Sequence, residues 1–173
     1  MRQIVTIILA TVILGCTGGN VKESHTSENL ASDSTSQYNG YDMVELFRTR
    51  TGHITATINV NGKPCIFLID TGGGATLIDK SKMRNYGLEA ARTGDYAAGI
   101  GSVSSLVKTK ATFHINDTDI EVKDLFLMDI SYINVEFKKN RARQVDGVIG
   151  TDFLDRYGAL IDYANKKMYL KLE

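Results

Sequence analysis

The sequence predicts a mostly β protein, a small closed barrel with one or two short helices. Two observations lead to this fold class. Short apolar or alternating segments recur between turn-forming residues, and strong helical periodicity is nearly absent. Many short strands at regular spacing are typical of closed β architectures. The 173 residues are 43% hydrophobic and 23% charged, which is an ordinary composition for one globular domain with an appendage.

The clearest local pattern is a hairpin over residues 53–70. Apolar and polar residues alternate over residues 54–60, which is the two-residue period of a half-buried strand. Asn61-Gly62 follows at once, and this dipeptide tolerates the positive φ angles of a type I′ turn. Residues 65–69 are all apolar and predict a buried strand, with Pro64 near its start.

Two more hairpins and two short helices are expected. The hairpins pair residues 107–115 with 120–128 and residues 159–163 with 168–172. The helices are expected over residues 80–86 and 152–157. Residues 131–144 show no clear pattern, and we expect their basic cluster to be a solvated loop, with contact to anionic lipid or a substrate as the alternative. The cluster consists of Lys138, Lys139, Arg141 and Arg143.

The N-terminal residues predict a membrane-attached protein. Residues 1–15 have a positive start and an apolar stretch that is short for a bilayer span but fits a signal peptide. Ile13-Leu14-Gly15-Cys16 resembles a bacterial lipoprotein cleavage box, which implies acylation of Cys16 and a lipid anchor on the bacterial cell envelope, periplasmic or outer-membrane associated. A plain signal peptide or an uncleaved anchor is the alternative, because Leu14 stands where a small residue is more usual.

Composition assigns residues 16–40 to a flexible tether and residues 41–173 to the folded domain. The tether is rich in Ser, Thr, Asn and Glu and has too few apolar residues to build a core. If Cys16 is acylated, Cys65 has no cysteine partner, and we expect it to be a small buried residue.

Charge and histidine content argue against several classes of function. The formal net charge is zero, so nothing favours a nucleic-acid partner. The three histidines have no partners at ligand spacing, and we expect neither a metal nor another cofactor. No Gly-x-Ser-x-Gly sequence is present, which leaves a serine hydrolase without support.

The chemistry is expected at Asp70-Thr71-Gly72, directly behind the predicted buried strand. An ionisable group on a loop positioned by a rigid strand is a favoured arrangement for catalysis. A second block, residues 146–163, contains Val148-Ile149-Gly150 and then a short predicted helix and a hairpin. In these two blocks, and over about residues 51–172, the chain resembles the retropepsin-like aspartyl proteases.

The resemblance implies a role for each matching residue. Asp70 would carry the catalytic carboxyl, and Thr71 and Gly72 would support its loop. Val148, Ile149 and Gly150 would pack under that loop. Residues 96–103 fall where the family has its flap. Four of them are expected to face the substrate: Tyr96, Gly99, Ile100 and Gly101. Gly73-Gly74 departs from the commoner family pattern, which has Ala next.

Peptide hydrolysis without a metal or a covalent intermediate needs one group that deprotonates water and another that protonates the peptide carbonyl. Two carboxyls about 3 Å apart that share one proton supply both. The chain has one Asp-Thr-Gly, so we expect a homodimer in which Asp70 faces its own copy across a two-fold axis. The expected function is an aspartic endopeptidase that acts on a peptide or protein substrate. A catalytically silent peptide-binding lipoprotein on the same fold is the main alternative.

Two further alternatives are disfavoured. Residues 70–76 also look like the phosphate loop of actin-like ATPases, but that fold needs two large α/β lobes. Asp152 is conceivable as a second carboxylate within the chain. Near the start of a short helix, however, an Asp more often interacts with the helix dipole or caps the helix.

Overall fold

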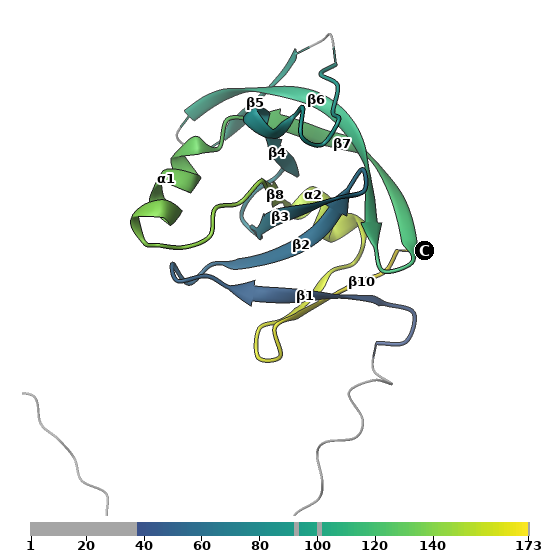
Figure 1. Ribbon diagram of the computed structural model, residues 1–173. Helices are drawn as coiled ribbons and strands as arrows, with labels where there is room; N and C mark the ends of the chain where they lie inside the picture. The colour runs from purple at the N-terminus through teal and green to yellow at the C-terminus, as the bar shows by residue number, and fades with distance from the viewer. Residues whose placement is uncertain (1–37, 92–93, 100–101, 173) are drawn as a thin grey trace, which may run out of the picture. The chain divides into compact units, whose positions relative to one another are not determined.

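The computed structural model describes residues 38–91, 94–99 and 102–172, with only the backbone given for residues 94–99 and 102–105 (Figure 1). The predicted signal peptide and nearly all of the predicted tether lie outside the described residues. No helix in the described ranges is long and apolar enough to cross a lipid bilayer.

The described residues form ten strands, one 3-10 helix and two α-helices. The strands are β1 (Asp42–Arg48), β2 (Ile54–Val60), β3 (Lys63–Ile69), β4 (Leu77–Asp79), β5 (Gly94–Gly99), β6 (Ser102–Ile115), β7 (Thr118–Met128), β8 (Gly147–Ile149), β9 (Leu160–Asp162) and β10 (Lys167–Leu170). The helices are η1 (Lys80–Lys82), α1 (Ser131–Lys139) and α2 (Thr151–Arg156).

Six of these strands close into a barrel, which confirms the predicted fold class. Neighbouring strands pair in the order β6-β7-β4-β8-β3-β2, and β2 pairs back to β6 through Asn59↔His114 and Val60↔Phe113. Strands β1, β10 and β9 extend the sheet from β2, and β5 pairs with β6 at the other end (Figure 1).

The β2–β3 hairpin has the predicted turn. Val60 pairs with Lys63, and the two residues between them, Asn61 and Gly62, have φ angles of 48° and 78°. These angles fit the positive-φ centre of a type I′ turn. After the turn, β3 runs antiparallel to β2 as a strand of the barrel and ends at Ile69, immediately before Asp70.

Strand β3 is buried because apolar clusters cover both of its faces. On one side, Phe67 packs against Phe113, whose ring in turn lies 5.7 Å from that of Phe153. On the other side, Leu68 belongs to a smaller cluster that contains Phe137 of α1. Burial on both faces explains why the sequence here is a continuous apolar run and does not alternate. Cys65, on the same strand, is buried and forms no disulfide among the described residues, and burial raises the pKa of its thiol.

Three expectations about secondary structure need correction. The turn between β6 and β7 spans residues 116–117 and is shorter than predicted. The helix expected over residues 80–86 is only the 3-10 helix η1, capped by a bond from the Ser81 N–H to Asp79 Oδ1 (2.9 Å). The chain then turns at Gly87, with a φ of 61°, and Tyr86 and Leu88 on either side of it are buried in the core.

The third correction concerns residues 131–139, which form helix α1 where we expected a solvated loop. Its stability comes from tertiary contacts. Phe137 is buried, and the buried Asn134 amide donates to the Val145 carbonyl and accepts from the Val145 N–H, both at 2.9 Å. The hairpin predicted for the C-terminus is confirmed, with β9 and β10 paired through Met168↔Ile161.

Candidate active site

The backbone of Asp70 is fixed where β3 leaves the barrel wall. β3 runs parallel to β8, with Leu68 opposite Val148 and Ile69 opposite Ile149. The Asp70 N–H continues this pairing by donating to the Ile149 carbonyl at 3.0 Å. The position of Asp70 is therefore set by two strands that are far apart in the sequence.

Asp70 is half-buried, and one of its two carboxyl oxygens accepts a hydrogen bond. The Gly72 N–H donates to Oδ1 at 2.9 Å, and the Gly73 N–H donates to the Asp70 carbonyl at 3.2 Å. Oδ2 accepts no hydrogen bond from the described residues. A Cβ atom on Gly73 would lie 3.1 Å from Oδ2, so this glycine keeps the space beside the second oxygen open.

The far end of the Asp70 loop is tied to the start of α2. The Thr76 hydroxyl is fully buried; it donates to Asp152 Oδ1 at 2.7 Å and accepts from the Gly150 N–H at 3.1 Å. The Thr76 N–H donates to Asp152 Oδ2 at 3.0 Å. In addition, the Thr151 N–H donates to the Gly73 carbonyl at 2.7 Å. These bonds join the loop of residues 70–76 to residues 149–152 along most of its length.

Close packing accompanies these bonds at Gly150. A Cβ atom there would lie 2.6 Å from the carbonyl carbon and oxygen of Ala75. Gly150 has extended backbone angles (φ −97°, ψ −179°), which any residue can adopt, so the requirement for glycine is steric. In the structure, Val148, Ile149 and Gly150 thus lie directly beside the Asp70 loop.

Asp152 is not placed as a second catalytic carboxylate. Both of its oxygens accept hydrogen bonds, from Thr76 and from the Phe153 N–H (2.8 Å to Oδ1), and among the described residues it has no hydrogen bond with Asp70. It lies in the first turn of α2, as expected for a residue that interacts with the helix dipole, but the N-cap position belongs to Gly150. Its bond to Thr76 was not predicted.

The other predicted site residues are only partly described. Thr71 and Gly72 are exposed at the tip of the loop. β5 and β6 form a hairpin in which Tyr96 pairs with Ser105 and Gly99 with Ser102, so a backbone hairpin is present where the flap is expected. Ile100 and Gly101, which stand between these two strands in the sequence, lie outside the described residues, and the side chains of residues 94–99 and 102–105 are not described.

A small pocket of about 290 Å³ borders the loop on the α2 side. It is lined by residues that include Gly74, Thr76 and Asp152. Asp124 of β7 also lines this pocket. Its carboxyl group forms ion pairs with Lys108 (Nζ to Oδ1, 2.8 Å) and with Arg156 of α2 (guanidinium nitrogen to Oδ2, 3.1 Å). The hydrogen bonds from Lys108 and Arg156 hold the pKa of Asp124 below its usual value. This ion-paired group, which the sequence did not reveal, connects α2 to the barrel wall.

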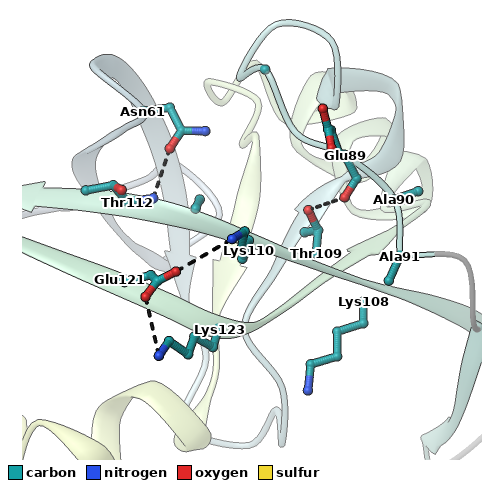
Figure 2. A pocket seen from close by; sticks show the side chains of 12 residues that line it. Asn61, Glu89, Ala90, Ala91, Lys108, Thr109, Lys110, Thr112, Glu121 and Lys123 are labelled. Carbon is teal, nitrogen blue, oxygen red and sulfur yellow. Dashed lines mark hydrogen bonds and ion pairs between the residues drawn. The ribbon is translucent and has the colours of Figure 1, made fainter.

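A larger groove of about 580 Å³ lies along β6 and β7 (Figure 2), and none of the predicted site residues is among those that line it. Within it, Glu121 lies between Lys110 and Lys123, at 3.9 and 3.4 Å, and the Thr109 hydroxyl donates to the Glu89 carbonyl at 2.7 Å. Because acidic and basic groups alternate there, the groove indicates no particular class of ligand.

Comparisons with known proteins agree with this arrangement. A family model described as gag-polyprotein putative aspartyl protease matches residues 56–156, a span that holds both the Asp70 loop and the Val148–Gly150 segment. The chain therefore belongs to this family of retropepsin-like aspartic proteases. A search of curated proteins finds no match.

Solved structures of similar fold come from a virus, a protozoan and a bacterium. The EIAV protease, in complex with the inhibitor HBY-793, is 20% identical and aligns over 62% of this chain and 90% of its own, with a TM-score of 0.47. The retroviral protease-like domain of Ddi1 from Leishmania major is 14% identical. It aligns over 69% of this chain and 88% of its own, with a TM-score of 0.49. A retropepsin-like aspartic protease from Rickettsia conorii is 17% identical. It aligns over 75% of this chain and 89% of its own, with a TM-score of 0.47.

The close approach at Gly150 gives a first prediction. Gly150→Ala should lower the free energy of unfolding by about 1–3 kcal/mol, because the added methyl group forces the Ala75 backbone away. Urea denaturation followed by circular dichroism measures this change. Gly74→Ala is the matched control, because a Cβ atom there meets nothing within 4 Å, and it should leave stability unchanged or slightly raised. Equal losses in both variants would contradict the steric argument.

The hydroxyl of Thr76 gives a second prediction. Thr76→Val keeps the shape of the side chain but leaves Asp152 Oδ1 and the Gly150 N–H each without one buried partner. We expect a loss of about 2–4 kcal/mol in the free energy of unfolding. Thr76→Ser retains the hydroxyl and should lose clearly less. If the two variants are equally stable, the hydroxyl does not hold the loop.

Proposed function

We propose that the protein is an aspartic endopeptidase that hydrolyses peptide bonds as a homodimer, with water activated between two copies of Asp70. One observation carries the proposal. Asp70 is held at the end of β3 with Oδ1 bonded to the Gly72 N–H, and Oδ2 has no hydrogen-bond partner among the described residues. A fixed carboxyl group with a free oxygen is suited to proton transfer. Membership of the aspartyl protease family adds support.

The dimer is proposed because one chain has only half of the required chemistry. The sequence contains one Asp-Thr-Gly, and the oxygens of Asp152 are already occupied. A two-fold axis beside the loop would bring two identical Asp70 carboxyls together. At about 3 Å, the repulsion between two negative charges keeps one proton on the pair, so that one member is ionised and the other protonated.

The proposed reaction uses both states. The ionised carboxyl takes a proton from water while the water oxygen bonds to the peptide carbonyl carbon. The protonated carboxyl gives its proton to the carbonyl oxygen, and a tetrahedral diol forms. On collapse, the first carboxyl protonates the amine nitrogen as the C–N bond breaks, and the second takes a proton from a diol hydroxyl. The pair returns to its starting state, and its two pKa values belong to the pair as a whole.

The proposed substrate is an extended peptide held between the Asp70 loop and the β5–β6 hairpin. Closure of such a hairpin over the peptide would exclude bulk water from the reaction. Residues 96–103 form the proposed covering segment, including Tyr96, Gly99, Ile100 and Gly101.

The test of this function is Asp70→Asn. The amide is too weak a base to accept a proton from water and too weak an acid to protonate the carbonyl, so cleavage should fall by about 10³-fold or more while the fold is retained. Full-length protein in a neutral detergent is incubated with a peptide library over about pH 4 to 7, and the products are identified by mass spectrometry. Asp117→Asn, in the exposed turn between β6 and β7, is the matched control and should cleave as the parent does.

Three outcomes distinguish the possible functions. Cleavage by the Asp70→Asn variant at the parental rate would show that the mechanism is wrong. Peptide binding by the parent with no products at any pH would favour the silent peptide-binding module. For the proposed dimer, the specific activity should fall on dilution, because the subunits separate. The dimer would be excluded if the specific activity does not change on dilution and the active protein has the mass of a monomer.

We also propose that Cys16 is acylated and anchors the protein to the bacterial envelope. Parental protein should be found in the membrane fraction with a mass increase from its acyl chains, and Cys16→Ser should lose both the increase and the acyl anchor. Cys65→Ala is the control: because Cys65 is buried, this variant should remain acylated. An unchanged mass for Cys16→Ser would contradict the anchor.

A further inference from the structure

A second feature, separate from the Asp70 loop, is a pocket of about 340 Å³ lined by four arginines. Arg48 and Arg50 come from the end of β1 and the turn that follows it. Arg141 and Arg143 come from the segment after α1, which lies beside this turn in Figure 1. We call this feature the arginine pocket; none of its lining residues belongs to the loop of residues 70–76.

Among the described residues, no acidic side chain balances the charge of the arginine pocket. No Asp or Glu lines it, and within the described part of the chain none of the four guanidinium groups forms an ion pair. Arg48 donates one hydrogen bond, to the Gly52 carbonyl at 3.4 Å. Four like charges around one hollow repel one another, and a bound anion would relieve this repulsion.

The two segments that carry the arginines are held by hydrogen bonds. In the turn, the Thr49 N–H donates to the His53 carbonyl at 2.8 Å, and the Gly52 N–H donates to the Thr49 carbonyl at 3.0 Å. After α1, the Ala142 N–H donates to the Phe137 carbonyl at 2.8 Å. The rings of His53 and Phe137 lie 5.4 Å apart and bring the two segments into contact.

Arg141 stands at a position where glycine is preferred. It follows the C-cap of α1 and has a φ of 53°, in the left-handed region. Helices commonly end on a glycine in this conformation, because a side chain there is strained. With this backbone conformation, Arg141 lines the same pocket as Arg48 and Arg50.

We propose that the arginine pocket binds a phosphate group. The planar guanidinium group donates two parallel hydrogen bonds to a phosphate, and several arginines match a group with more than one negative charge. Thr57 also lines the pocket. Phe47, with 54% of its surface exposed, lines it as well and offers an apolar contact to whatever carries the phosphate. The carrier is either a phospholipid headgroup or a soluble phosphate compound.

The test is calorimetric titration of the full-length chain, in neutral detergent and low salt, with two probes: inorganic pyrophosphate and dihexanoyl phosphatidic acid. Arg48→Gln/Arg141→Gln should weaken binding by about tenfold or more, because two charge-assisted contacts are lost. Arg50→Gln/Arg143→Gln should act in the same direction. Arg84→Gln/Lys171→Gln removes the same charge from exposed positions outside the pocket and should change binding by less than about twofold.

The outcomes identify the carrier or overturn the proposal. Tighter binding of the short-chain lipid, with pyrophosphate as competitor, indicates a headgroup; tighter binding of pyrophosphate indicates a soluble compound. The proposal is wrong if neither probe binds, if the control variant weakens binding as much as the pocket variants do, or if citrate binds as tightly as pyrophosphate. The arginines are exposed, and equal unfolding midpoints would verify that all variants fold.

Discussion

The parallel pairing of β3 with β8 is the constraint on which the candidate site depends. It aligns Ile69 with Ile149 and continues into the bond from the Asp70 N–H to the Ile149 carbonyl. Once this register is fixed, Gly150 lies against Ala75, and Thr76 reaches Asp152. A shift of one residue would turn every side chain of the strand to the opposite face, so the apolar clusters on both sides of β3 also fix the carboxyl group.

This arrangement determines how much freedom the loop has. Gly72, Gly73 and Gly74 would give an isolated segment great conformational freedom. In the structure, the loop carbonyl at Gly73 and the side chain at Thr76 are both bonded to residues 150–152. The glycines therefore provide space around the carboxyl oxygens, while order is imposed from the second segment. A double glycine in place of the commoner family pattern is compatible with a well-defined Asp70 for this reason.

Local features were predictable from the sequence, and contacts between distant segments were not. Asn61-Gly62 determines its turn through its own backbone preference, and the apolar run before Asp70 indicates a buried strand without reference to the rest of the chain. The bond from Thr76 to Asp152 joins residues 76 positions apart, and no local pattern encodes it. Helix α1 was missed because its buried residues, Asn134 and Phe137, bond to or pack on segments outside the helix. The basic cluster showed only half of the arginine pocket, since Arg48 and Arg50 come from another part of the sequence.

The position of β5 has a consequence for how a long ligand would enter. Among the described strands, β5 pairs only with β6, at the end of the sheet order, and takes no part in the closed ring of six strands. Movement of β5 would break none of the hydrogen bonds that close the ring of six strands. A ligand could therefore enter and leave beside β5 without disturbing the packed interior of the barrel. The edge of β5 that does not face β6 also presents a row of main-chain donors and acceptors, because no described strand pairs with it. In general, a strand edge of this kind can bind an extended chain through its backbone, whatever side chains that chain carries.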